Sequence, residues 1–207
     1  LREAGVPIAD CQVAESAEDA VAAAEAMGYP VVMKGGAGGL LHKTEAGAVR
    51  VGLTDGEAVR AAYGEVSAAV AGKPGAVVYL QPLAGAGVEL LLGLRVDPAF
   101  GPVVAVGLGG TLVEVMKEAS LRLAPVGVEE AAVMLGETKA GELLAGVRGR
   151  GPFDAAAAAE AVAAFSRFGA ALAGDLEALE VNPLIVLPQG QGAVGVDAAF
   201  EERESKP

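Results

Sequence analysis

Three oxygen-bearing side chains near the C-terminal end of the chain have the spacing of a metal site. Glu180 and Asn182 alternate with apolar residues, the pattern of a half-buried strand, so we expect both side chains on one face of that strand. The turn-rich segment 188–192 folds the chain back as a hairpin and returns Asp197 to a place opposite Asn182. Oxygen ligands that leave room for phosphates and water suit Mg²⁺. On spacing alone, a hairpin with a solvated polar face is an equally good interpretation.

A lysine directly before a glycine-rich loop is the second candidate for chemistry. Lys34 ends an apolar, strand-like segment, where an ammonium group is costly to bury unless an anion meets it. In the loop at 35–39, Gly36, Gly38 and Gly39 let backbone N–H groups approach a ligand closely. The loop is not a P-loop, because no Gly-Lys-Ser/Thr motif closes it. An edge-strand lysine with its ammonium group in water is the alternative interpretation.

The chain has a single histidine, His42, which follows the glycine-rich loop in a polar segment. Histidine can act as a nucleophile towards a phosphoryl group. A lone histidine is more often a packed or surface residue, but a polar and flexible setting favours a functional role here.

Three further positions could bind parts of a nucleotide. The connector Gln81-Pro82-Leu83 separates two groups of predicted elements, and its main-chain groups could bind an adenine edge. Glu89 begins an apolar strand and is placed to accept hydrogen bonds from ribose hydroxyls, although a charged strand end in solvent is the alternative. Arg122 lies between two leucines, faces away from them and could meet phosphates. Nothing in the sequence indicates a Ser/His/Asp triad or a Cys/His nucleophile pair.

The composition excludes several classes of protein. A net charge of −12 disfavours general binding to nucleic acids or anionic membranes, although a basic pocket could still hold a small anion. Hydrophobic residues make up 53% of the chain, so it is not a disordered protein. The single cysteine, Cys11, allows no internal disulfide and no cysteine-based zinc site. The most apolar stretch, residues 101–116, is interrupted by glycines and a glutamate and predicts no membrane span; we expect a cytoplasmic protein.

The elements that must position these residues form two α+β lobes. We assign residues 1–82 to an N-terminal lobe, 83–200 to a C-terminal lobe and 201–207 to a charged tail. The caps Ser16, Asp55 and Asp154, together with helix breakers, predict helices at 16–27, 57–70, 128–135, 140–144 and 155–172. Apolar runs predict strands at 31–34, 48–53, 76–80, 88–96, 102–108 and 121–123, besides the hairpin. Consecutive strands in the second lobe favour an antiparallel sheet.

Four stretches, taken in order, resemble the ATP-grasp domain of ADP-forming acyl-CoA synthetases, which are relatives of the succinyl-CoA synthetase β subunit. They are Gly28-Tyr29-Pro30-Val31-Val32-Met33-Lys34, Leu41-His42-Lys43-Thr44-Glu45-Ala46-Gly47, Gly87-Val88-Glu89 with Asp97-Pro98-Ala99-Phe100-Gly101-Pro102, and Leu179-Glu180-Val181-Asn182-Pro183 with Asp197-Ala198. The resemblance spans nearly the whole chain. It implies an ATP-grasp fold with ATP or ADP between the two lobes.

The resemblance also implies roles for the nucleotide-binding candidates. Lys34 and the glycine-rich loop would hold the phosphates, the connector at 81–83 the adenine, and Glu89 the ribose.

The metal and the reacting group follow from the same resemblance. Asn182 and Asp197 would bind Mg²⁺, with Glu180 as a third ligand. His42 matches the histidine that relays a phosphoryl group in this family. Arg122 is added from its position and charge alone.

The implied activity is that of the nucleotide-binding module of an ADP-forming acid–CoA ligase. Such a module exchanges a phosphoryl group between ATP or ADP and a phosphohistidine. The sequence shows no CoA-binding segment, so the expected partner is a CoA-binding α subunit or domain that carries its own phosphohistidine; a homo-oligomer is also compatible. Two alternatives stay open: a regulatory or non-catalytic ATP-grasp domain of a protein acetyltransferase fusion, and another ATP-grasp carboxylate ligase. The histidine separates them, because an acyl-phosphate ligase needs no phosphohistidine.

Overall fold

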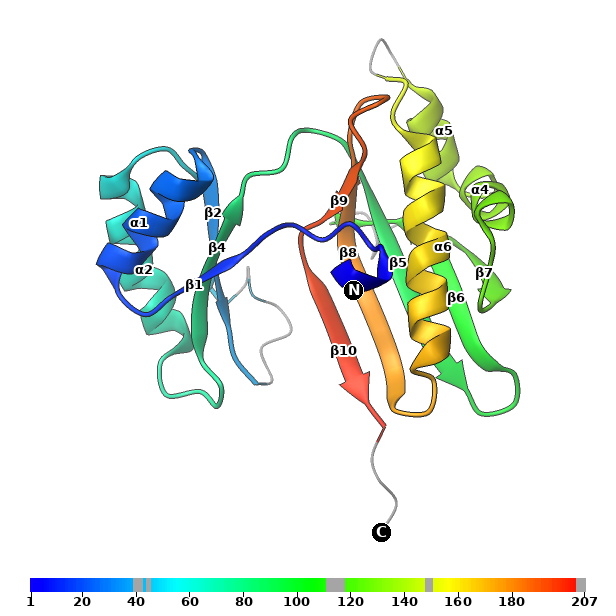
Figure 1. Cartoon of the computed structure of the whole chain (residues 1–207), viewed down its shortest axis with the longest axis horizontal. Helices are drawn as coiled ribbons and strands as arrows, with labels where there is room; N and C mark the ends of the chain where they lie inside the picture. Colours follow the sequence, from blue (N-terminus) through cyan, green and yellow to red (C-terminus); the bar gives the residue numbers. More distant parts are fainter. Residues whose placement is uncertain (39–42, 44–45, 111–117, 148–150, 204–207) are drawn as a thin grey trace. The chain divides into compact units, whose positions relative to one another are not determined.

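The chain is described by a computed structural model that covers residues 1–38, 43, 46–110, 118–147 and 151–203. It divides into two compact units, a smaller one of Ala9–Leu83 and a larger one that combines Leu1–Ile8 with Ala84–Pro207 (Figure 1). Each unit has helices, an antiparallel sheet and its own hydrophobic core, which confirms the predicted α+β class. None of the described helices combines the length and the hydropathy that a membrane crossing requires.

The first eight residues belong to the larger unit, which corrects the assignment of residues 1–82 to one lobe. Val6 is 1% exposed and lies in the core of the larger unit. The Gly195 N–H donates a hydrogen bond to the Pro7 carbonyl oxygen at 2.6 Å, and Ile8 forms a parallel bridge with Gly195. These contacts join distant parts of the chain, so local sequence patterns carry no signal for them.

The smaller unit is a four-stranded antiparallel sheet with helices on one face. Its strands, in spatial order, are β1 (Gln12–Ala14), β4 (Val77–Pro82), β2 (Val31–Gly36) and β3 (Val49–Leu53). The helices are α1 (Ala17–Met27) and α2 (Gly56–Val70), which Figure 1 shows on the same side of the sheet.

Both helices of the smaller unit begin at the capping residues that the sequence predicts. The Ser16 hydroxyl accepts a hydrogen bond from the Asp19 N–H at 3.0 Å, and the Asp55 carboxylate accepts one from the Ala58 N–H at 2.8 Å. Each bond satisfies one of the N–H groups that the first turn of a helix leaves without a main-chain partner.

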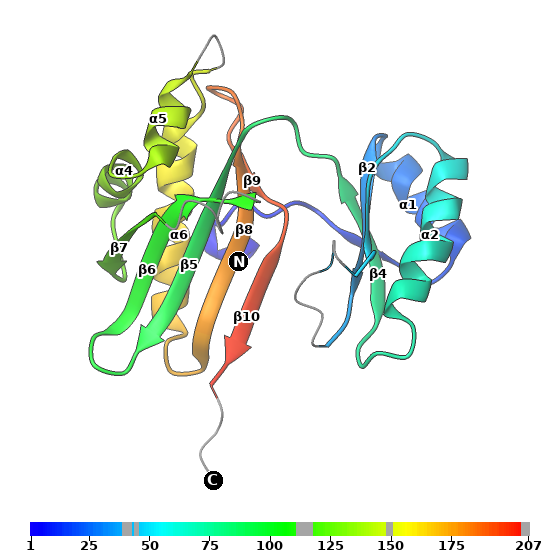
Figure 2. The same ribbon diagram turned by 180° about the vertical axis from the view of Figure 1, so that it is seen from behind.

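The larger unit contains a six-stranded antiparallel sheet with the order β10-β8-β5-β6-β7, and β9 pairs with β8. The strands are β5 (Val88–Asp97), β6 (Gly101–Leu108), β7 (Ala119–Leu123), β8 (Leu176–Val186), β9 (Ala193–Gly195) and β10 (Ala198–Glu202). Its helices are η1 (Arg2–Ala4), α4 (Val128–Gly136), α5 (Lys139–Ala145) and α6 (Ala155–Ala171). Figure 1 shows α6 in front of the sheet, and Figure 2 shows the opposite face of the same sheet.

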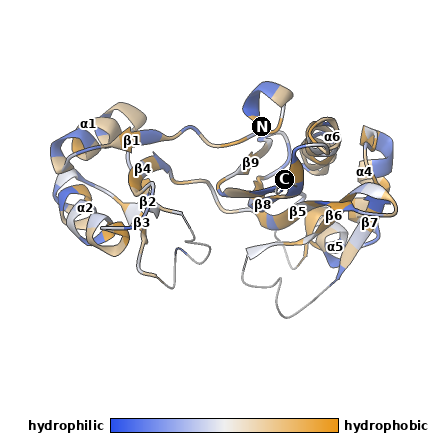
Figure 3. Cartoon of the chain, turned by 90° about the horizontal axis from the view of Figure 1, so that it is seen from below, coloured by the Kyte–Doolittle hydropathy of each residue, from blue (hydrophilic) through white to orange (hydrophobic). Residues whose placement is uncertain are grey.

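One face of the larger sheet packs against α4, α5 and α6. Leu90, Leu92 and Leu94 alternate along β5 towards this face and are buried with Phe165 of α6 in one core. Figure 3 shows hydrophobic residues on α6 and on the strands of this unit. The alanine-rich helix α6 lies so close to the sheet that a Cβ atom at Gly169 would overlap the Leu94 side chain. The intervening residues of β5 therefore face away from the helices.

The last strand, β10, extends two residues into the segment 201–207 that the sequence assigns to a tail. β10 pairs with β8 as far as Glu202, which lies opposite Leu176. The Arg203 N–H then donates to the Asp175 carbonyl oxygen at 2.8 Å. The charged residues at 201–202 thus form an edge strand, where charge is tolerated because the strand is exposed.

Candidate functional site

The hairpin formed by β8, β9 and β10 brings Asp197 opposite Asn182, in agreement with the sequence prediction. The Asn182 N–H donates to the Asp197 carbonyl oxygen at 3.1 Å, and the next residues, Val181 and Ala198, are register partners. Val181 is fully buried on the helix-covered face, whereas Glu180 is exposed and Asn182 is half-buried. Because strand residues alternate between faces, Glu180 and Asn182 lie on the face away from the helices.

A bulge interrupts β8 at the candidate metal site. Leu90 of β5 pairs with Leu184, and Leu92 pairs with Val181, so two residues of β8 lie opposite the single residue Leu91. The two residues are Asn182 and Pro183, and proline has no N–H to donate to the ladder. Bulges of this kind redirect side chains and are common beside functional sites.

The glycine pair that follows β6 contacts both strands that carry site residues. The Gly109 N–H donates to the Glu89 carbonyl oxygen at 2.8 Å. The Gly110 N–H donates to the side-chain oxygen Oδ1 of Asn182 at 3.0 Å. A Cβ atom at Gly110 would overlap the carboxylate oxygen Oε2 of Glu89. Glu89, Asn182 and Gly110 therefore lie together on the face away from the helices.

Sequence reasoning did not predict the role of Gly110 in this group. The available signal was the pair Gly109-Gly110 directly after a predicted strand, which is typical of a close approach between backbone and another group. That signal indicates a close contact at the glycine pair, but it does not identify the contacting residues. Glu89 and Asn182 are identified only by the pairing of β5, β6 and β8.

The donor set at the hairpin consists of oxygen atoms and fits Mg²⁺. Asn182 offers an amide oxygen, Asp197 offers a carboxylate, and Glu180 lies one alternation away on the same face. One Asp197 oxygen accepts the Ala198 N–H at 3.1 Å. Among the described residues, no cluster of three or more His, Cys, Asp or Glu side chains could hold a metal. Proteins usually bind Mg²⁺ through one or two carboxylates together with substrate phosphates and water, which are oxygen donors of the kind that Asn182 and Asp197 offer.

The smaller unit collects the phosphate candidate and the adenine candidate on one face of its sheet. Lys34 pairs in register with Tyr79, and Val32 pairs with Gln81. The paired residues Met33 of β2 and Leu80 of β4 are buried in the core that this sheet forms with α1 and α2. Side chains alternate along a strand, so Lys34, Tyr79 and Gln81 face away from the helices. Lys34 is 8% exposed and Gln81 is 4% exposed. Sequence reasoning missed Tyr79, although its alternation with Gln81 was the available signal.

The segment that the sequence predicts as a connector is the end of a strand. Gln81 and Pro82 are the last residues of β4, and the Leu83 N–H donates to the Pro30 carbonyl oxygen at 3.1 Å. The Leu83 N–H is therefore hydrogen-bonded within the smaller unit, and adenine binding by the other main-chain groups of residues 81–83 stays a prediction. The side chain of Gln81 stays a candidate.

The glycine-rich loop begins inside β2, and one of its predicted donors is occupied. Gly36 is the last residue of β2 and pairs with Val77. The Gly38 N–H donates to the Pro74 carbonyl oxygen at 2.7 Å, and phosphate binding by this loop stays a prediction. Gly39 and His42 lie outside the described residues.

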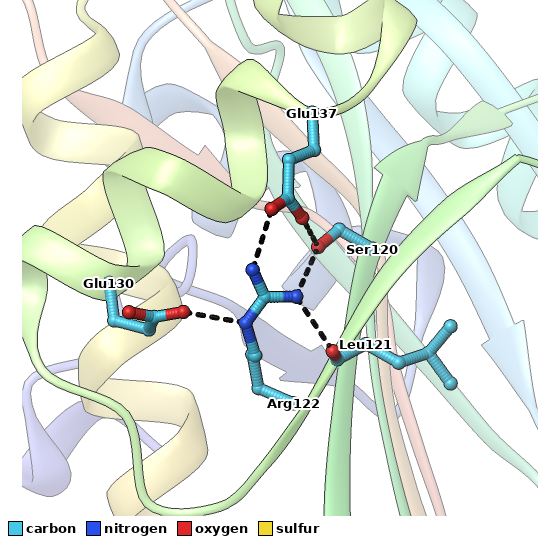
Figure 4. Close-up of polar contacts among 5 residues, drawn as sticks. All are labelled: Ser120, Leu121, Arg122, Glu130 and Glu137. Carbon is cyan, nitrogen blue, oxygen red and sulfur yellow. Dashed lines mark hydrogen bonds and ion pairs between the residues drawn. The ribbon is translucent and has the colours of Figure 1, made fainter.

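Arg122 has a different role from the one that the sequence suggested. It pairs in register with Val104, which is fully buried, and so it lies on the helix-covered face of the sheet, opposite to Asn182 and Glu89. Figure 4 shows its guanidinium group between two carboxylates of the α4 region, Glu130 at 2.5 Å and Glu137 at 2.6 Å. The phosphate-binding prediction for Arg122 is therefore corrected.

The ion pairs of Arg122 shift the pKa values of the groups involved. The hydrogen bonds that the Arg122 guanidinium donates to Glu137 and Glu130 raise its pKa above the ordinary value. The hydrogen bonds that Glu137 accepts from Arg122 and Ser120 hold the pKa of its carboxyl group below its ordinary value. Arg122 thus fastens β7 to α4, and its charge is already neutralised within the protein.

Comparison with known proteins identifies the family of this chain. A family model described as an ATP-grasp domain matches residues 1–201. The chain is 34% identical, over 205 residues, to subunit β of the ADP-forming acetate–CoA ligase I of Pyrococcus furiosus, which covers 96% of this chain and 86% of that subunit. It is 35% identical to the ADP-forming 4-hydroxybutyrate–CoA ligase of Nitrosopumilus maritimus, with 93% of this chain covered, but it spans only 28% of that ligase.

Solved structures of a related enzyme have the same fold. An acetyl-coenzyme A synthetase of Ca. Korarchaeum cryptofilum in complex with coenzyme A and Ca-AMPCP superimposes with a TM-score of 0.89 and 36% identity, covering 98% of this chain and 89% of that chain. Another structure of that synthetase contains coenzyme A and Mg-AMPPCP; it covers 98% of this chain and 88% of that chain, with a TM-score of 0.83 and 34% identity. The chain therefore belongs to the ATP-grasp domain family, in the group formed by the β subunits and ATP-grasp domains of ADP-forming acyl-CoA synthetases.

Proposed function

We propose that this chain is the nucleotide-binding module of an ADP-forming acyl-CoA synthetase and exchanges a phosphoryl group between ATP or ADP and a histidine. The observation that carries the proposal is the pairing of Asn182 with Asp197 on the open face of the larger sheet. Related proteins support it, because the Ca. Korarchaeum cryptofilum synthetase binds Mg-AMPPCP and is 34% identical to this chain.

The metal would be held by Asn182 and Asp197, with Glu180 beside them, and when bound it neutralises negative charge on the phosphates. In the same unit, the Glu89 carboxylate is exposed and accepts hydrogen bonds from the ribose hydroxyls. In the smaller unit, the Lys34 ammonium group binds phosphate oxygens and the Gln81 side chain binds the adenine. Phosphoryl transfer depends mostly on such positioning and charge stabilisation.

His42 is the proposed phosphoryl acceptor. A ring nitrogen of His42 attacks the γ-phosphorus of ATP, the bond from that phosphorus to the bridging oxygen breaks, and ADP leaves with the electron pair. The reverse step forms ATP from phosphohistidine and ADP. The assignment rests on the family motif Leu41-His42-Lys43-Thr44-Glu45-Ala46-Gly47 and on the absence of a second histidine from the sequence.

The complete reaction requires a CoA-binding partner. The chain spans 86% of subunit β of the Pyrococcus furiosus acetate–CoA ligase I but only 28% of the Nitrosopumilus maritimus ligase. We therefore propose that an α subunit, or further domains of a longer protein, bind CoA and the acid. The partner would receive the phosphoryl group from His42 on a histidine of its own.

Titration with nucleotide tests the metal site. ADP and ATP, with and without Mg²⁺, are added to the wild-type chain and to the variants Asn182→Ala and Asp197→Ala, and unfolding is followed by thermal shift. A ligand that binds only the folded chain stabilises it by about 2.7 kcal/mol at 100 times its dissociation constant. Both variants should lose the Mg²⁺-dependent part of this stabilisation, whereas Glu201→Ala, which removes a carboxylate elsewhere on the hairpin, should keep it.

The role of His42 is tested by phosphoryl exchange with the partner present. His42→Ala should abolish exchange between ATP and ADP and leave nucleotide binding intact. Unchanged exchange in His42→Ala would overturn the relay role and favour another carboxylate ligase. Nucleotide binding without any exchange in the wild-type protein would favour the regulatory alternative.

A further inference from the structure

The turn formed by Gly109 and Gly110 is attached to both strands that carry the proposed site. Gly109 binds the β5 main chain at Glu89, at 2.8 Å, and Gly110 binds the β8 side chain of Asn182, at 3.0 Å. The glycine pair directly follows β6, which pairs with β5 along its whole length. The turn is therefore held in place by the sheet before it reaches Asn182.

The hydrogen bond from Gly110 determines how the side-chain amide of Asn182 is oriented. An N–H donor can be accepted only by the oxygen of an amide, never by its NH₂ group. The amide oxygen has two lone pairs, so one remains for a cation after the Gly110 N–H has used the other. Without this bond, the amide could rotate by half a turn and present its NH₂ group to the metal.

The same glycine also determines where the Glu89 carboxylate can lie. The φ angle of Gly110 is 62°, in the left-handed region, and a Cβ atom built on it would overlap Glu89 Oε2. Any other residue at this position must displace either the carboxylate or the turn, and displacement of the turn breaks the bond to Asn182. A Cβ atom at Gly110 would thus disturb both the proposed ribose ligand, Glu89, and the proposed metal ligand, Asn182.

We propose that Gly110 is a positioning residue for the Mg-nucleotide: its N–H orients the Asn182 oxygen towards the cation, and its lack of a side chain leaves Glu89 its place. This inference rests on the proposed function, since it assigns a role to Gly110 through Asn182 and Glu89. Loss of a residue that orients a metal ligand commonly weakens metal affinity about 10- to 100-fold.

The chain offers a matched control for substitution of Gly110. Gly101, at the opposite end of β6, has a similar φ of 78°, and a Cβ atom there would meet nothing within 4 Å. Gly101→Ala therefore introduces the same backbone strain without the overlap at Glu89. A difference between Gly110→Ala and Gly101→Ala measures the overlap and the bond to Asn182 rather than the cost of alanine in a left-handed conformation.

The experiment measures ADP affinity by calorimetry with and without Mg²⁺ for the wild-type chain, Gly110→Ala and Gly101→Ala, with folding checked by circular dichroism. Gly110→Ala should bind Mg-ADP about 10- to 100-fold more weakly, and metal-free ADP, which is affected only through the displaced Glu89, should lose less affinity. Gly101→Ala should behave as the wild type in both titrations. Equal losses with and without Mg²⁺ in Gly110→Ala, or no loss in either titration, would overturn the inference.

A second variant keeps the test decisive if Gly110→Ala folds poorly. In Gly110→Ala/Glu89→Ala the overlap is absent, so the turn can return to Asn182. For each variant, the ratio of its affinity for Mg-ADP to its affinity for metal-free ADP is measured. This ratio should be the same in the double variant as in the single variant Glu89→Ala. Failure to recover this ratio in a folded protein would contradict the role of the overlap. Absence of nucleotide binding in the wild-type chain would instead overturn the proposed function.

Discussion

Among the described residues, Lys34 is the one charged side chain that is buried. It is 8% exposed and lies on the face of its sheet that the helices leave open. A buried ammonium group needs polar or anionic groups around it, and we propose that the phosphates of a bound nucleotide are among them. The strand pattern predicted its position, and the pairing with Tyr79 shows which residues accompany it.

Replacement of Lys34 by methionine, which has a similar volume and no charge, should weaken nucleotide binding. A hydrogen bond to a charged group contributes about 1.5–3 kcal/mol, so we expect a loss of about 10- to 100-fold in affinity for ADP. Calorimetric titration of Lys34→Met measures it, and Lys73→Met, in an exposed turn of the same unit, is the control. Equal affinity in both variants would remove Lys34 from the site.

Arg122 is the contrasting case at the residue scale. The sequence places it opposite its leucine neighbours, but alternation alone cannot tell which face of a sheet will be covered by helices. Its partners Glu130 and Glu137 come from a helix later in the chain, and they occupy the guanidinium group. A residue whose function depends on a partner from another element is beyond the reach of local patterns.

Arg122→Met should therefore lower the melting temperature and leave nucleotide affinity unchanged. The variant removes the ion pairs between β7 and the α4 region and leaves two carboxylates without their partner. Thermal unfolding and ADP titration of the same sample separate the two effects. A loss of ADP affinity as large as that of Lys34→Met would restore Arg122 to the phosphate site.

At the scale of elements, Asp154 connects helix α6 with the hairpin that carries the proposed metal ligands. Its carboxylate caps α6 through the Ala157 N–H at 3.2 Å, as the sequence predicts. The same carboxylate accepts the N–H groups of Gly190 at 3.0 Å and Gly192 at 2.9 Å, in the turn that precedes β9. The cap was predictable because it lies within one helical turn, whereas the bonds to the hairpin were not.

The hydrogen bonds of Asp154 should make stability depend on acid pH. The N–H groups of Gly192, Ala157 and Gly190 hold the pKa of the Asp154 carboxyl group below its ordinary value. A lowered pKa in the folded chain gives a stabilising contribution that is complete above about pH 4 and is lost as the pH falls through the folded pKa. The melting temperature of Asp154→Asn should thus lie below that of the wild type at pH 7, and the gap should narrow below about pH 4.

Glu160→Gln is the control for this measurement, because Glu160 lies on the same helix and is exposed. Its melting temperature should follow that of the wild type across the whole pH range. A gap between the wild type and Asp154→Asn that stays constant down to pH 2 would show that the carboxylate of Asp154 does not titrate in this way.

At the scale of the whole molecule, each of the two units is stabilised by a hydrophobic core of its own. One contains Phe165 of α6 and the leucines of β5, and the other contains Met33, Val66 and Leu80 between the smaller sheet and its helices. Apolar periodicity and caps predicted nearly every helix and strand of both units, since these signals are local. The attachment of Leu1–Ile8 to the larger unit was not predictable, because it depends on contacts with Gly195.

Phe165→Ala should destabilise the larger unit selectively. Phe165 is fully buried, and truncation of a buried phenylalanine costs about 3–5 kcal/mol. Hydrogen exchange should accelerate in α6, β5 and β6, while amides of α1 and α2 keep their protection, because they belong to the other core. Equal acceleration in both units would show that they unfold as one cooperative system.

The division of the chain also affects the order of folding during translation. The smaller unit is continuous from Ala9 to Leu83, so all of its strands and helices have left the ribosome before most of the larger unit exists. The larger unit needs segments on both sides of the smaller one, since Leu1–Ile8 can contact its partner only when Gly195 has been synthesised. Domains generally fold as units and those synthesised first fold first. The smaller unit can therefore fold as an insert while the segment Leu1–Ile8, already synthesised, has not yet met its partner Gly195.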